Sequence, residues 1–269
     1  TAVGKNSLSA NTTASNNTAV GRNALIANTT GTQNVAVGAL ALDANTTASY
    51  NTAVGYSALT ANTTGAFNVA TGRYALGGNT TGSSNTATGL EALNSNTTAS
   101  NNTAMGYYAL TANTTGTELT AVGRYALKSS TTGSYNSALG TNALQANTTG
   151  YNNTALGRSA MYSNTTGHTS VAVGYEALYS QAGDAYQNVG VGTEALRNNT
   201  TGKYNSAVGY RALYTATTAN DNSAFGRESL FSNTTGASNV VMGYQAGYDN
   251  TTGNSNSFIH LTMPPPNRL

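Results

Sequence analysis

The chain is poor in the residues that most binding sites and most ordinary cores require. It has no cysteine, no tryptophan and three prolines, and 7% of its 269 residues are charged, against roughly a quarter in a typical soluble domain. The lack of cysteine excludes disulfides and thiolate metal sites. Eleven Lys and Arg residues against nine Asp and Glu are too few positive charges for a nucleic-acid partner. Without a run of about 20 apolar residues, we expect no membrane insertion by this segment.

What is abundant is Thr, Asn, Ala, Ser and Gly, arranged in a repeat of 17 residues. Fifteen units fill residues 1–256, and only the unit 171–188 is longer, by one residue. We number the consensus [T/V/S]-A-V-G-x-x-A-L-x-x-N-T-T-G-x-x-N from position 1 to position 17. Residues 257–269 form a partial repeat that we expect to cap the array, followed by a Pro-rich tail. The chain opens inside a repeat, which suggests a processed or excised segment.

The repeat predicts an all-β fold, a parallel β-solenoid or β-roll in which each unit forms one coil. The stretch N-T-A-V-G alternates with period two and is rich in β-branched residues, as short strands are. The segment x-x-A-L-x-x fits either a second strand or a short helical turn. Position 4 is Gly in all fifteen units, which requires a positive φ or a second backbone packed against it.

The small residues at positions 2 and 4 would form a flat stripe along the array. Since one Val and one Leu per coil make a thin core, we expect further burial by assembly. Our hypothesis is that this stripe packs against other copies of the chain, most simply in a trimer. The alternative is that the stripe faces the opposite wall of its own coil.

Stacking also explains why charge is scarce. Equivalent residues on adjacent coils lie about 4.8 Å apart, so one charge repeated on every coil would repel its neighbours. Neutral Asn side chains can instead bond to the Asn above and below. Position 17 is Asn in thirteen units, and we predict that Asn34, Asn51, Asn68 and Asn85 form such a ladder.

These repeats resemble the head repeats of trimeric autotransporter adhesins of the YadA type. They are still more similar to the NTAVGYxALxxNTTG arrays of phage tail fibres and bacterial surface fibres, which residues 103–116 match nearly throughout. The resemblance covers residues 1–256 and implies a trimeric parallel β-roll that serves as a shaft or an adhesive head. The 17-residue unit is longer than the usual adhesin-head repeat, and a stalk or anchor domain is absent from this chain.

Catalytic and metal-binding patterns are missing from the sequence. His168 and His260 lie in different units, and the acidic residues are scattered. We therefore expect no enzyme, no metal site and no cofactor.

The Asn-Thr-Thr turn matches the N-glycosylation acceptor pattern in twelve units. We favour a structural role, because Asn tolerates turn geometry and Thr caps it, and keep a glycoprotein as the alternative. The candidate acceptors are Asn11, Asn28, Asn45, Asn62, Asn79, Asn96, Asn113, Asn147, Asn164, Asn199, Asn233 and Asn250.

Tyr and Arg share position 5 of many units, which suits contact with a protein or a sugar surface but equally suits packing between coils. This candidate contact column comprises Arg22, Tyr56, Arg73, Tyr107, Arg124, Arg158, Tyr175, Tyr210, Arg227 and Tyr244. At the end of the array, Phe258, Ile259 and Leu261 are candidates for an end-to-end contact or for a cap.

The sequence therefore predicts a structural, extracellular fibre module of a cell surface or virion, which mediates attachment or surface display. Its expected partners are other copies of itself, as a trimer, and a host-surface protein or glycan. The main alternative is a self-polymerising extracellular filament. A lesser one is an ice-binding solenoid, suggested by the Thr columns.

Overall fold

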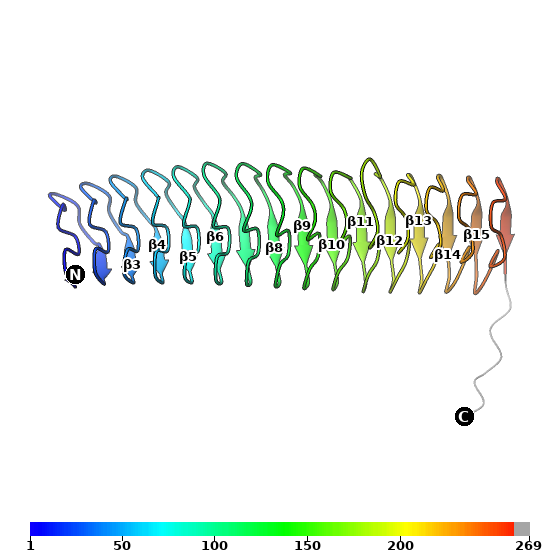
Figure 1. Ribbon diagram of the computed structural model, residues 1–269, viewed down its shortest axis with the longest axis horizontal. Coiled ribbons are helices and arrows are strands. Elements are labelled where there is room, and N and C mark those ends of the chain that lie inside the picture. Colours follow the sequence, from blue (N-terminus) through cyan, green and yellow to red (C-terminus); the bar gives the residue numbers. More distant parts are fainter. Residues whose placement is uncertain (261–269) are drawn as a thin grey trace, which may run out of the picture. The chain divides into compact units, whose positions relative to one another are not determined.

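A computed structural model describes residues 1–260 of the chain. It contains two compact units, Thr1–Asn136 and a second that begins at Ser137, and each is described here by itself. Both are all-β, and every strand in the described residues is parallel to its partner. The predicted parallel β-solenoid is therefore confirmed, with one strand for each coil (Figure 1).

The first unit contains eight strands: β1 (Ala2–Val3), β2 (Thr18–Val20), β3 (Val35–Val37), β4 (Thr52–Val54), β5 (Val69–Thr71), β6 (Thr86–Thr88), β7 (Thr103–Met105) and β8 (Thr120–Val122). The second unit also contains eight: β9 (Ser137–Leu139), β10 (Thr154–Leu156), β11 (Val171–Val173), β12 (Val189–Val191), β13 (Ser206–Val208), β14 (Ser223–Phe225), β15 (Val240–Met242) and β16 (Ser257–Ile259).

Within each unit, a strand pairs with the strand of the next coil at the same repeat position. Ala19 pairs with Ala36, seventeen residues on. The longer coil keeps this alignment, because Val171 pairs with Val189, eighteen residues on. The extra residue is thus absorbed outside the strand.

The prediction that the stripe of small residues at positions 2 and 4 forms an outer surface is wrong for position 2. Ala at position 2 is buried inside the coil, as at Ala19, Ala36 and Ala53. Val at position 3 points outward, and Val20 and Val37 are each 37% exposed. The alternative, in which position 2 faces the interior of its own coil, is the correct one. The interior side of the strand takes a small side chain in most coils, although Val241 is also completely buried there, and the larger side chain of position 3 is left outside.

The segment x-x-A-L-x-x is neither a strand nor a helical turn. Non-glycine residues at positions 6, 8 and 16 have left-handed φ values between 49° and 63°. Leu25 and Leu42 at position 8 are among them, and both are completely buried. A left-handed residue costs about 1–2 kcal/mol, whereas burying a Leu side chain gains about 1.5–3 kcal/mol. Burial therefore outweighs the backbone cost at position 8.

Glycine is required at position 4 both because φ is positive there and because the backbone of the next coil packs against it. Gly55 has φ 139°, and a Cβ built on it would lie 2.5 Å from the carbonyl oxygen of Gly72 on the next coil. The same combination of positive φ and close backbone contact recurs at Gly21 and Gly38.

The predicted Asn ladder at position 17 is present and buried. The backbone N–H of Asn51 donates to Asn34 Oδ1 at 2.9 Å, and that of Asn68 donates to Asn51 Oδ1 at 2.9 Å. The side-chain amide of Asn34 donates to the carbonyl of Ala48 on the next coil at 2.8 Å. Each Asn thus links its own coil to both neighbours.

A second ladder, which the sequence reasoning missed, runs through the Asn of the Asn-Thr-Thr turns at position 11. Asn62 Nδ2 donates to Asn45 Oδ1 of the preceding coil at 3.1 Å and to Gly65 O of its own turn at 2.9 Å. Asn79 Nδ2 then donates to Asn62 Oδ1 at 2.8 Å. The two ladders satisfy polar groups in the interior without any charge.

The second ladder is interrupted where another residue occupies position 11. The next coil after Asn113 carries Ser130, and the next coil after Asn199 carries Ala216. Asn113 Oδ1 and Asn199 Oδ1 are buried without a hydrogen-bond partner as a result, and Ser130 Oγ is likewise unsatisfied. An unsatisfied buried acceptor costs about 1–3 kcal/mol, so these coils are weak points of the stack.

Candidate functional site

The candidate contact column at position 5 is exposed and also packed within itself. Tyr107 is 43% exposed, and its ring centroid lies 4.4 Å from that of Tyr108 and 5.5 Å from that of Tyr125. The Arg124 guanidinium lies 4.6 Å from the Tyr125 ring. Rings that pack on their neighbours keep a fixed orientation, so the column presents a rigid aromatic surface.

The other members of this column are similarly arranged, in each unit separately. In the first unit, Arg73 lies 5.0 Å from the Tyr74 ring, which meets Tyr56 edge to face. In the second, Arg227 lies between Tyr210 and Tyr244, at 5.7 and 5.4 Å. The remaining members are Arg22, which is exposed, and Arg158, which lies 5.6 Å from the Tyr175 ring.

Charged side chains of the second unit pair across coils beside this column. Arg197 Nε lies 2.7 Å from Glu176 Oε2 and 3.8 Å from Glu194 Oε1, and Arg211 pairs with Glu194 at 2.5 Å. Burial raises the pKa of Glu176, but hydrogen bonds from Tyr175 and Arg197 outweigh it and leave the pKa below its ordinary value. Glu176 and Glu194 bring like charges to adjacent coils, and Arg197 contacts both of them.

The Asn-Thr-Thr turns place the candidate acceptor nitrogen inside the coil. Ten of the twelve Asn side chains have no exposed surface, and only Asn11 and Asn250 are half-buried. Asn28 Nδ2, for example, donates to Asn11 Oδ1 at 3.2 Å and to Gly31 O at 2.9 Å. N-glycosylation would replace one of the two N–H groups of this side-chain amide by the sugar. Because the nitrogen is buried and both N–H groups are in use, the folded coil has no room for a glycan there.

The two threonines of each turn differ in exposure. Thr29 Oγ1 donates to the carbonyl of Thr46 on the next coil at 3.1 Å, whereas Thr30 is exposed. One exposed Thr column therefore remains at position 13, interrupted at Gly183. An ice-binding surface built on paired Thr columns is not favoured by this geometry.

Phe258 occupies position 2 of the last described coil, where most other coils have Ala, and it is 37% exposed. A Cβ on Gly247 would lie 3.0 Å from the Phe258 ring and 3.2 Å from Leu230. The ring thus occupies the space that Leu fills at position 8 of other coils. Ile259 points outward and is 70% exposed, and Leu261 lies outside the described residues.

His168 is stacked rather than placed beside a reactive group. Its ring lies 4.6 Å from that of Tyr151 and 5.0 Å from that of Tyr186, both nearly parallel to it. Within residues 1–260, no three His, Asp or Glu side chains gather where they could hold a metal ion. The described residues also contain no helix that is long and apolar enough to cross a membrane.

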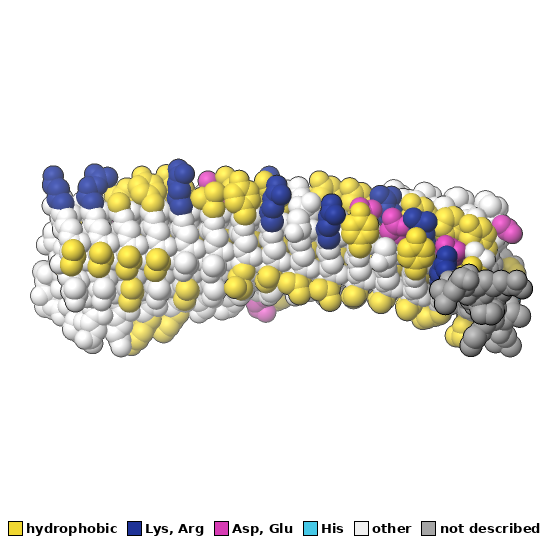
Figure 2. All heavy atoms as spheres, turned by 90° about the horizontal axis from the view of Figure 1, so that it is seen from below, with side chains coloured by type: hydrophobic (Ala, Val, Ile, Leu, Met, Phe, Trp, Pro, Cys, Tyr) yellow, Lys and Arg dark blue, Asp and Glu magenta, His cyan; other side chains and the backbone are white. Residues whose placement is uncertain are grey.

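An outer apolar column lies at position 3, which the sequence reasoning had assigned to the core. Its exposed members between β2 and β15 are Val20, Val37, Val54 and Met105 in the first unit, and Leu139, Leu156, Phe225 and Met242 in the second; they are 37–56% exposed, and Figure 2 shows apolar side chains in rows along this face. Thr71 and Thr88 interrupt the column, and Val122, Val173, Val191 and Val208 are half-buried.

No protein-family model matches the chain, and no curated protein sequence matches it at a significant level.

Proposed function

We propose that the chain is a structural module of an extracellular fibre, which mediates attachment or surface display as a homo-oligomer. The outer apolar column carries this proposal. Large exposed apolar surfaces in soluble proteins mark sites of association, and this one occupies the same repeat position on three adjacent coils of the first unit (β2 to β4) and on two adjacent pairs of coils of the second (β9 and β10, β14 and β15). A second copy with the same spacing matches it coil for coil, and three copies are the stoichiometry that the resemblance to adhesin heads implies.

The solenoid suits such a role because each coil contacts only its neighbours. The interior has little apolar volume beyond Leu at position 8 and Ala at positions 2 and 7. Covering the outer column in an assembly would add the burial that a single chain lacks.

Sedimentation velocity and electron microscopy of the purified chain test the proposal. We expect an oligomer of the 27.3 kDa chain that forms particles of fixed length. Replacing Val37 and Val54 with Glu should give a folded monomer, because each copy would then bring like charges to the interface. A matched control carries the same substitutions at Thr30 and Thr47, which are exposed at position 13.

A wild-type chain that sediments as a monomer at high micromolar concentration would overturn the oligomer. Filaments of indefinite length would instead support the alternative, self-polymerisation.

A further inference from the structure

The one irregular coil of the array opens a groove in the second unit. Residues 171–188 carry one extra residue, in the turn Gln181–Ala185. Gly183 takes a left-handed φ of 54° there, with open space where its Cβ would lie. Because β11 and β12 remain in register, the extra residue changes only the outer corner of the coil.

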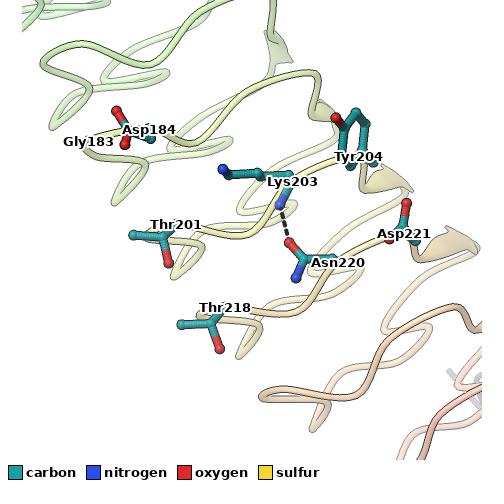
Figure 3. Close-up of a pocket in the computed structure, with 8 residues that line it drawn as sticks. All are labelled: Gly183, Asp184, Thr201, Lys203, Tyr204, Thr218, Asn220 and Asp221. Atoms are coloured by element: carbon teal, nitrogen blue, oxygen red, sulfur yellow. Dashed lines mark hydrogen bonds between the residues drawn. The ribbon is translucent and has the colours of Figure 1, made fainter.

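The groove has a volume of about 790 Å³, within the range of small-molecule sites. It crosses this coil and the next two, and Figure 3 shows polar side chains of all three coils along it. Its lining is Gly183, Asp184, Thr201, Lys203, Tyr204, Thr218, Asn220 and Asp221.

Tyr204 supplies an aromatic face with a fixed orientation. Its side chain is 47% exposed, yet its hydroxyl lies 2.9 Å from that of Tyr186, and the two rings meet edge to face at 5.2 Å. The Lys203 ammonium lies 4.6 Å from the Tyr186 ring. A ring held in this way binds a flat, weakly polar surface at little entropic cost.

The other polar groups that line the groove are acceptors and donors suited to hydroxyl groups. Asp184 and Asp221 are exposed, and neither forms a salt bridge within residues 137–260. The backbone N–H of Lys203 donates to Asn220 Oδ1 at 2.8 Å, which fixes the carboxamide. Thr201 adds a hydroxyl on the opposite side (Figure 3).

We propose that this groove binds a neutral oligosaccharide, with one pyranose ring stacked on Tyr204. The apolar face of a pyranose packs on an aromatic ring, while its hydroxyls donate to the carboxylates of Asp184 and Asp221. Adjacent coils are about 4.8 Å apart, close to the length of one pyranose, so three coils accommodate two or three sugar units. Two carboxylates against the single ammonium of Lys203 disfavour acidic sugars.

This inference extends the attachment part of the proposed function, but its site is complete within one chain. Saturation-transfer NMR and calorimetry with cellotriose, triacetylchitotriose and maltotriose test it, with trigalacturonate as the acidic comparison. We expect at least one neutral trisaccharide to bind. Tyr204→Ala should weaken its affinity about tenfold or more, the equivalent of about 1.4 kcal/mol, and Asp221→Asn should weaken it without altering the coil.

Two controls distinguish binding in the groove from nonspecific binding to exposed tyrosines. Tyr135→Ala removes an equally exposed tyrosine from the same repeat position, 16, of another coil, and should leave the affinity unchanged. Deleting Asp184 restores a 17-residue coil and should abolish binding. Failure of every neutral trisaccharide to bind, preference for trigalacturonate, or equal binding by Tyr204→Ala would each overturn the proposal. Because a monomer also contains the whole groove, none of these results depends on the oligomer.

Discussion

Repairing the interrupted Asn ladder should stabilise the chain. Ala216 is completely buried at position 11, between coils that carry Asn199 and Asn233. In Ala216→Asn, the new amide would donate to Asn199 Oδ1, which has no partner now, and would accept from Asn233 Nδ2. Position 11 is not left-handed in any coil, so the substitution brings no backbone strain.

The magnitude follows from the two bonds gained. A net hydrogen bond is worth about 0.5–1.5 kcal/mol, and fixing the new side chain costs less than about 1 kcal/mol. We therefore expect a gain of about 1–2 kcal/mol. The reverse change, Asn62→Ala, removes bonds to Asn45 and Gly65 and the acceptor of Asn79, so it should cost about 2–4 kcal/mol.

Urea unfolding and hydrogen exchange measure these effects. Because coils of a solenoid can open locally, exchange of the amides in residues 199–236 is the sharper assay. Protection there should rise about tenfold in Ala216→Asn, since 1.4 kcal/mol corresponds to that factor. Ala216→Leu, of similar size but without polar atoms, is the control and should destabilise. Equal stabilities for Ala216→Asn and Ala216→Leu, together with a neutral Asn62→Ala, would refute a stabilising role for the ladder.

Further predictions concern the backbone, the end of the array, charge and the turns. Gly55→Ala should cost about 2–6 kcal/mol, from strain and overpacking, and an unchanged melting temperature would contradict the close contact between coils. Gly247→Leu should destabilise the chain, because the new side chain clashes with Phe258, and it should destabilise a Phe258→Ala background less. A double-mutant cycle without coupling between the two positions would exclude the idea that Phe258 fills the space of the missing Leu. The pKa of Glu176 is lowered on folding, so its ion pair with Arg197 stabilises the folded chain at neutral pH. This stabilisation is lost as the pH falls below the ordinary pKa of 4.5. The urea midpoint of Glu176→Gln should therefore depend less on pH below 4.5 than that of the wild type. Intact mass of folded protein from a glycosylating host should equal that of the bare polypeptide, and mass added at the buried turns would contradict the ladder geometry.

Periodicity alone predicted much of this fold. The spacing of 17 residues predicted the coil and its register, Gly at position 4 predicted the backbone contact, and Asn at position 17 predicted a ladder that is present at Asn34 and Asn51. These features recur on most coils, so comparing the repeats within one chain reveals them.

The facing of side chains was not predictable in the same way. Period-two alternation separates Ala19 from Val20 but does not say which side is the interior, and hydrophobicity favours the wrong one. Left-handed Leu at position 8 contradicts local propensity and is explained only by burial. The groove depends on a single extra residue beside Asp184, whose effect on the surface appears only when three coils are placed together.

The hydrogen bonds of the position 11 ladder all run in the same direction along the stack of coils. Every side-chain amide in an unbroken stretch points its donor toward the earlier coil and its acceptor toward the later one, as from Asn79 to Asn62 to Asn45. Such aligned dipoles polarise one another. An unbroken stretch therefore has two chemically different ends: a side-chain donor at its N-terminal end and a side-chain acceptor at its C-terminal end, as at Asn113 and Asn199, whose Oδ1 atoms have no partner.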